Sequence, residues 1–158
     1  MAITSCGRWV VAVVDDDAAV CDSMRCLLEA SDLDVQTYQR GADFLKNQPE
    51  IACLITDYDL PDIDGLELIS ELRKRGSQVP MIVSTAATDP WIKRCVAEAG
   101  IKFVLEKPYS YEALLGAIRE ELFGVGCGQW RSSMTIETRR SRAAPARAPL
   151  NVNEAKAK

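Results

Sequence analysis

The sequence predicts an α/β fold in which five parallel strands form a doubly wound sheet covered by five helices. The chain has 158 residues, the length of one ordinary domain. Hydrophobic residues make up 47% of it and charged residues 27%, as in globular proteins. Short apolar runs alternate with stretches of helical periodicity. Because strands connected through helices lie parallel with right-handed crossovers, this alternation favours a layered sheet with helices on both faces.

Most of the expected strands are short, apolar runs, as strands buried on both faces are, and residues 35–38 form a weaker one. They cover residues 9–14, 35–38, 51–56, 81–84 and 103–105. The expected helices repeat apolar residues at helical spacing. They cover residues 18–30, 41–47, 66–75, 90–99 and 111–122. Asp89 and Ser110 are expected to cap the helices over residues 90–99 and 111–122, and Gly76 and Gly100 are expected to end those over residues 66–75 and 90–99.

Charge divides the chain into two parts. Residues 1–123 hold 12 basic and 21 acidic side chains, a net charge of −9, whereas residues 124–158 hold 7 basic and 2 acidic ones, a net charge of +5. An acidic body is the opposite of a nucleic-acid-binding surface, so no direct nucleic-acid contact is expected. The second part lacks apolar periodicity. We therefore expect a folded domain over residues 1–123 and a basic, disordered tail over residues 124–158.

Composition excludes several kinds of site. The sequence contains no histidine, which rules out a His-based triad and a Cys/His zinc site. Its six cysteines show no C-x-x-C spacing and are interpreted as reduced residues of a cytoplasmic protein. No apolar run approaches the roughly 20 residues of a membrane span, and no secretory signal is expected.

Polar side chains follow the ends of four expected strands. They are Asp15, Asp16 and Asp17, then Asp57, then Ser84 and Thr85, and finally Glu106 and Lys107. Ligands of such sheets bind beyond these strand ends. Clustered carboxylates raise one another's pKa unless a cation offsets them, and oxygen ligands without histidine favour Mg²⁺. A carboxylate can also be the nucleophile of phosphoryl transfer. The pattern therefore predicts a magnesium-dependent aspartyl phosphate.

The chain resembles the receiver domain of bacterial two-component response regulators over about residues 9–123. Four segments carry the resemblance, in the order VVDDDAAVCDSMRCLLEASDLDVQTY, LITDYDLPDIDGLELI, MIVSTAATD and FVLEKPY. Pro61 and Gly65 follow Asp57 by four and eight residues, which fits the family pattern D-x-x-x-P-x-x-x-G. The resemblance implies a flavodoxin-like sheet with strand order 2-1-3-4-5.

The resemblance also implies a role for each matching acidic residue. Asp57 is similar to the family's phosphoacceptor. Asp15 and Asp16 match its acidic pair, with Asp16 a direct Mg²⁺ ligand and Asp15 acting through water. The main-chain carbonyl of Asp59 would be another ligand. Asp17, Asp62 and Asp64 are instead interpreted as helix-start and loop residues.

Two further positions complete the implied site. Thr85 matches the family's switch hydroxyl, and Lys107 matches the lysine that binds the phosphoryl group. The family also implies a cis peptide bond between Lys107 and Pro108. One position departs from the pattern: Val104 stands where the family often carries Tyr or Phe, and Phe103 should point to the opposite sheet face. Aromatic switching is therefore in doubt.

The resemblance implies partners as well. A sensor histidine kinase or a phosphotransfer protein would donate the phosphoryl group. The tail is too short and too polar for a DNA-binding helix-turn-helix domain, so a stand-alone receiver acting through protein contact is expected. The surface of the fourth helix, fifth strand and fifth helix would bind a downstream protein or a second copy. Trp91 and Tyr109 are candidate contacts there.

Two alternative functions stay open at the level of sequence. Asp57-Tyr58-Asp59 after an apolar strand resembles the nucleophile motif of haloacid-dehalogenase-type phosphatases, with Asp59 as general acid. That motif normally follows the first strand, and it would leave Asp15 and Asp16 without a role. A receiver-like adaptor that is not phosphorylated is the second alternative, against which the complete acidic set argues.

Overall fold

The computed structural model describes residues 3–4, 7–86 and 89–124 and contains five strands and five helices in alternation. The strands are β1 (Val10–Val14), β2 (Asp34–Tyr38), β3 (Cys53–Asp57), β4 (Met81–Thr85) and β5 (Phe103–Glu106). The helices are α1 (Ala18–Glu29), α2 (Gly41–Asn47), α3 (Gly65–Lys74), α4 (Pro90–Glu98) and α5 (Tyr111–Phe123). All strand pairs are parallel and their order is β2-β1-β3-β4-β5. The predicted fold class and strand order are confirmed.

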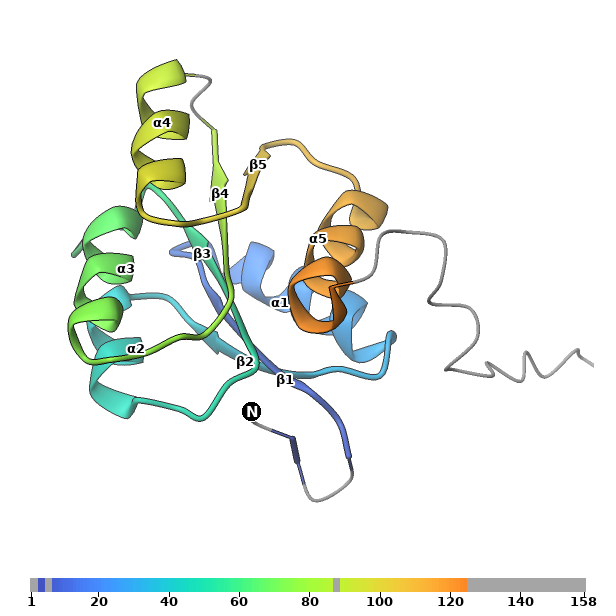
Figure 1. The fold of residues 1–158 in the computed structure, drawn as a ribbon. Coiled ribbons are helices and arrows are strands. Elements are labelled where there is room, and N and C mark those ends of the chain that lie inside the picture. The colour runs from blue at the N-terminus through green and yellow to red at the C-terminus, as the bar shows by residue number, and fades with distance from the viewer. Residues whose placement is uncertain (1–2, 5–6, 87–88, 125–158) are drawn as a thin grey trace, which may run out of the picture.

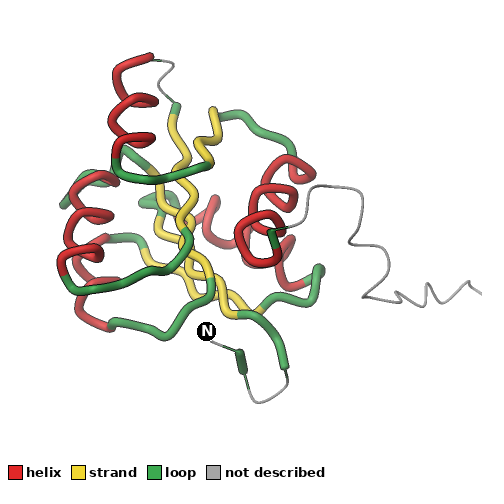
Figure 2. Tube along the Cα trace, in the orientation of Figure 1, coloured by secondary structure: helices red, strands yellow, loops and turns green. Residues whose placement is uncertain are grey.

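The sheet lies between two helical layers. Helices α1 and α5 cover one face, and α2, α3 and α4 cover the other, with the sheet as the central layer (Figures 1 and 2). Successive strand residues face opposite layers, as a pleated strand requires. Val13 and Ile82 thus pack in the cluster on the side of α1 and α5, whereas Val14 and Val83 pack in the cluster on the other side. The β-branched runs are buried because both faces are covered.

The strand boundaries differ from the sequence expectation where they meet the polar residues. β3 extends to Asp57 and β4 extends to Thr85, so both residues belong to the sheet and do not follow it. The reason is main-chain pairing, since Asp57 lies opposite Ser84 and Thr85 lies opposite Glu106 in the parallel register. Both side chains are consequently held by ordered strand backbone.

Side-chain caps begin four of the helices. The carboxylates of Asp17, Asp64 and Asp89 and the hydroxyl of Ser110 each accept a hydrogen bond from an amide in the first turn of α1, α3, α4 and α5. The expected helix ends are also found, because Gly76 has a φ of +82° after α3. The predicted tail lies outside the described residues from residue 125 onward. No helix in the described ranges is both long and apolar enough to span a bilayer.

Candidate functional site

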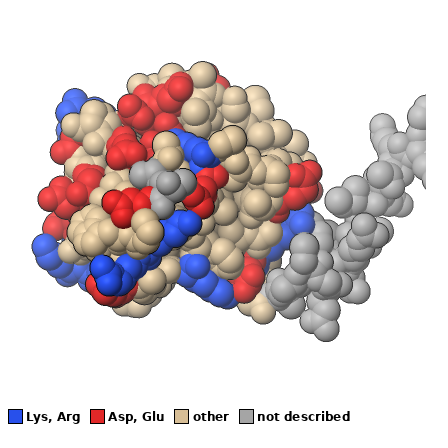
Figure 3. Space-filling view, turned by 90° about the horizontal axis from the view of Figure 1, so that it is seen from above, with Lys and Arg blue, Asp and Glu red and all other residues tan. Residues whose placement is uncertain are grey.

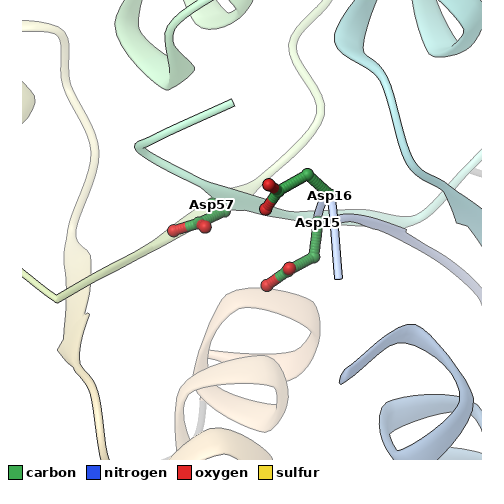
Figure 4. A group of neighbouring side chains, drawn as sticks. All are labelled: Asp15, Asp16 and Asp57. Carbon is green, nitrogen blue, oxygen red and sulfur yellow. The ribbon is translucent and has the colours of Figure 1, made fainter. Parts of the chain in front are cut away.

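Three aspartates from two neighbouring strands converge at the carboxyl end of the sheet. Asp15 and Asp16 follow β1, and Asp57 is the last residue of β3. One carboxylate oxygen from each residue lies within 4.8 Å of the others, and Figure 4 shows the three side chains next to one another at the ends of their strands. Such a set of oxygen donors suits a divalent cation that prefers carboxylates. The sequence prediction that these residues lie together is confirmed.

Lys107 supplies a positive charge inside this acidic group. Its Nζ lies 2.9 Å from Oδ2 of Asp15 and 3.1 Å from Oδ2 of Asp57. Burial lowers the pKa of the Lys107 ammonium, but its hydrogen bonds to the two carboxylates outweigh burial and raise that pKa above the usual value. The ammonium therefore stays charged and bridges β1 and β3 from the loop after β5.

The Asp57 carboxylate is the most constrained member of the group. The residue is 7% exposed, and its Oδ1 has no hydrogen-bond partner among the described residues. Burial raises the pKa of this carboxyl, with smaller contributions in the same direction from Asp15 and Asp59, whereas Lys107 acts to lower it. A buried carboxylate oxygen without a donor favours the binding of a cation or of an electrophile.

The two neighbours of Asp57 in the group differ in how they are held. Asp15 is 2% exposed, and its Oδ1 accepts the Asp17 amide at 2.9 Å while its Oδ2 accepts Lys107. Asp16 is exposed and forms no hydrogen bond or ion pair with the part of the chain that the structure describes. Asp16 is thus the carboxylate with the greatest freedom to coordinate an ion directly.

Main-chain hydrogen bonds fix the positions of Thr85 and Lys107 relative to Asp57. Thr85 ends β4 with no exposed surface, and its carbonyl accepts the Lys107 amide at 2.8 Å. The Ser84 carbonyl accepts the Tyr58 amide at 2.8 Å. The Lys107–Pro108 peptide bond is cis, as the family resemblance implies. Seen from above, the molecule carries acidic and basic side chains next to one another (Figure 3).

Gly65 explains the glycine of the sequence pattern. It begins α3, and its amide donates a hydrogen bond to the Tyr58 carbonyl at 2.9 Å. A Cβ at this position would lie 2.8 Å from the main-chain oxygen of Asp57 and 3.0 Å from the Cα of Tyr58. Only glycine therefore allows α3 to begin directly against the backbone of the site.

The remaining predicted residues are placed as follows. Asp59 is exposed in the loop between β3 and α3, and its carboxylate is not part of the group of three. Val104 packs toward the layer of α2, α3 and α4, while Phe103 packs toward the opposite layer. The predicted orientation of Phe103 is confirmed.

Two contacts near the site had no signal in the sequence. Asp62, interpreted as a loop residue, accepts hydrogen bonds from the first two amides of α2. The Ser84 side chain hydrogen-bonds the hydroxyl of Tyr109, whose pKa is raised by burial. In both cases the partners are far apart in the sequence, so no local motif marks them.

The family follows from the comparison of this chain with known proteins. A model of the response regulator receiver domain matches residues 11–119. The chain belongs to this family. It is 38% identical over 114 residues to the transcriptional regulatory protein FixJ of Azorhizobium caulinodans, which covers 71% of this chain and 54% of the relative. It is 34% identical over 114 residues to the transcriptional regulatory protein TdiR of Thauera aromatica, covering 71% of this chain and 50% of the relative. The chain thus spans about half the length of these relatives.

Solved receiver structures share the fold. The BeF3-activated DrrB receiver domain matches with a TM-score of 0.68 and 28% identity, covering 73% of this chain and 97% of that one. A CheY-like receiver domain from Methanospirillum hungatei matches with a TM-score of 0.69 and 26% identity, covering 73% and 94%. Membership of the receiver family supports phosphorelay signalling as the general role. The three aspartates form the kind of acidic pocket at which receiver domains typically bind Mg²⁺.

Proposed function

We propose that this receiver domain accepts a phosphoryl group on Asp57 from a sensor histidine kinase or a phosphotransfer protein. The observation that carries the proposal is the environment of Asp57, a buried carboxylate with one unpartnered oxygen, one oxygen beside the Lys107 ammonium, and two aspartates nearby. In the transfer, an Asp57 oxygen forms a bond to phosphorus while the P–N bond to the donor histidine breaks. The histidine keeps the electron pair of that bond.

The donor set supports Mg²⁺ as the cofactor of this reaction. We assign Asp16, Asp57 and the main-chain carbonyl of Asp59 as direct ligands, and Asp15 as a residue that acts through water. Both oxygens of Asp15 already accept hydrogen bonds, which favours the indirect role, whereas Asp16 is exposed and available. When bound, the ion offsets the repulsion between the Asp57 carboxylate and an incoming phosphoryl group.

Lys107 and Thr85 would respond to the phosphoryl group once it is attached. The Lys107 ammonium, already within 3.1 Å of Asp57, pairs with a phosphoryl oxygen by a charge-assisted hydrogen bond. The Thr85 hydroxyl binds a second oxygen and biases the conformation of the chain that follows β4. The side chain of Val104 is smaller than an aromatic ring, so this response does not depend on rotation of a ring at that position.

Output is proposed to occur through protein contact on the surface formed by α4, β5 and α5. Trp91 on α4 is a large apolar residue of this surface, with 53% of its area exposed. Tyr109, in the loop between β5 and α5, is half-buried. A downstream protein or a second copy of the chain would bind here. We place the protein in the cytoplasm, in line with the free thiols of its four described cysteines.

Acetyl phosphate with Mg²⁺ tests the proposal directly. Intact-mass analysis of the wild type should find one phosphoryl adduct, which should disappear in Asp57→Asn and on removal of Mg²⁺ with EDTA. Asp59→Asn is the matched control, because this exposed residue is expected to contribute only its carbonyl and should keep the adduct. An adduct that persists in Asp57→Asn would refute the assignment. Continuous turnover of a generic phosphate ester without a stable adduct would favour the phosphatase alternative.

A further inference from the structure

Helix α2 begins without a cap of its own. Arg40 stands at the N-cap position and makes no side-chain hydrogen bond to the helix. The missing bonds come from Asp62, which lies 20 and 21 residues further along the chain, in the loop between β3 and α3. Its Oδ1 accepts the Gly41 amide at 3.2 Å, and its Oδ2 accepts the Ala42 amide at 2.8 Å. Two amides that the helix leaves unpaired are thus satisfied by one carboxylate from another segment.

The contact between Asp62 and α2 is close and largely shielded from solvent. The Asp62 side chain is 9% exposed, and the Arg40 guanidinium lies 3.9 Å from its Oδ2. Gly41 is buried against the same loop, and a Cβ there would collide with Cγ2 of Ile63. Hydrogen bonds and steric fit therefore act together to hold the loop against α2, which lies beside α3 in Figure 1.

This contact fixes the middle of a loop whose ends are already held. At one end the Tyr58 amide is bonded to β4, and at the other the Asp64 carboxylate caps α3. Asp59 lies between them. The segment before α2 is likewise joined to the site, because the Tyr38 carbonyl accepts the Asp15 amide at 3.0 Å. Asp62 thus connects the loop after β3 to a segment that is anchored beside Asp15.

We propose that Asp62 is a positioning residue of the metal site: its bonds to α2 hold the loop after β3 where the Asp59 carbonyl meets the cation. The inference rests on the proposed function, since it takes Asp59 as a ligand through its main chain. Asp62 itself does not touch the ion. Its role is to restrict the loop to the one conformation in which the carbonyl contributes, so its loss weakens Mg²⁺ binding without removing a ligand.

Mg²⁺ affinity measured by isothermal titration calorimetry tests the inference. Asp62→Ala should raise the dissociation constant about fivefold, the factor by which loss of one helix cap typically shifts an equilibrium. Gly41→Ala should weaken Mg²⁺ binding in the same direction, because its Cβ would meet Ile63 and push the loop away although Asp62 itself is not replaced. Asp43→Ala is the matched control. It removes an exposed carboxylate from the first turn of the same helix, without a bond to the loop, and should leave the affinity unchanged.

The outcomes separate the inference from the proposed function. A wild type that does not bind Mg²⁺ would contradict the proposed function itself. A wild type that binds Mg²⁺ together with an Asp62→Ala variant of equal affinity would overturn only the positioning role. If Asp62→Ala does not fold, Asp62→Asn, which keeps the volume and one acceptor oxygen, is measured with the same expected direction. Mg²⁺-dependent phosphorylation by acetyl phosphate should then require more Mg²⁺ for half-maximal rate, while the rate at saturating Mg²⁺ stays close to that of the wild type.

Discussion

Replacement of Asp57 by Asn is expected to stabilise the protein in the absence of divalent cations. Burial raises the pKa of the Asp57 carboxyl, so the folded state holds its proton more tightly than the unfolded state does. The ionised carboxylate therefore destabilises the fold above its unfolded pKa of about 3.9, and this penalty disappears in more acidic solution. Asn removes the charge and keeps the shape.

The size of the effect follows from the contacts of the two carboxylate oxygens. Burying this charged carboxylate with Oδ1 left without a donor costs about 1–3 kcal/mol more than burying the neutral Asn amide in its place. The partly exposed pair between Oδ2 and Lys107 offsets about 1 kcal/mol of this cost. The expected net gain for Asp57→Asn is about 1 kcal/mol. With a urea m-value of about 2 kcal/mol/M, the unfolding midpoint should rise by about 0.5 M.

Urea unfolding followed by circular dichroism in EDTA measures this gain. The midpoint of Asp57→Asn should exceed that of the wild type at pH 7.5, and the two should coincide near pH 3. Asp59→Asn, at an exposed position two residues away, should show no comparable gain. Addition of Mg²⁺ should raise the midpoint of the wild type more than that of Asp57→Asn. A lower midpoint for Asp57→Asn at pH 7.5 would refute the reasoning, because the pair with Lys107 would then outweigh burial.

Gly65→Ala should lower the free energy of unfolding by about 2 kcal/mol, since the new Cβ meets the Asp57 backbone; an unchanged urea midpoint would mean that α3 can shift. Burial alone would raise the pKa of Asp62, but its two bonds to α2 amides lower it. The ionised Asp62 carboxylate therefore stabilises the fold above pH about 3.9, and this effect is lost as the pH falls through the lower pKa of the folded state. The difference in unfolding free energy between wild type and Asp62→Asn should vanish in acid. A difference that does not change with pH would contradict this prediction. Iodoacetamide at pH 8 should label exposed Cys26 long before Cys53, because burial raises the pKa of the Cys53 thiol to about 12. Peptide mass spectrometry measures the two rates, and equal labelling of the two cysteines would contradict the prediction.

The sequence predicted the parts of the fold that depend on local patterns. Alternating apolar runs predict the strands and helices, and the rule that ligands bind beyond strand ends predicts that Asp15, Asp57 and Lys107 lie together, as they do. The expected boundaries at Asp57 and Thr85 are less accurate, because the sequence pattern ends a strand at the first polar residue. Main-chain pairing with the next strand continues regardless of side-chain polarity.

Contacts between distant segments could not be predicted in this way. Aspartate is common in turns, so Asp62 looks like an ordinary turn residue. Nothing near it in the sequence indicates that a helix 20 residues earlier lacks a cap. Gly41 likewise resembles any helix-start glycine until Ile63 is found against it. The contact between Ser84 and Tyr109 depends on β4 and the loop after β5 lying side by side. Such features depend on tertiary packing, which periodicity does not encode.

The hydrogen bonds that continue past the strands have a mechanical consequence. The Tyr58 amide is bonded to Ser84, and the Lys107 amide is bonded to Thr85, so the last residues of β4 are tied to both flanking strands. A displacement of Thr85 would therefore also move the backbone on either side of it, so that the ends of three strands would move together. A binding partner that contacts one of these strands would then respond to a chemical change at a carboxylate on another.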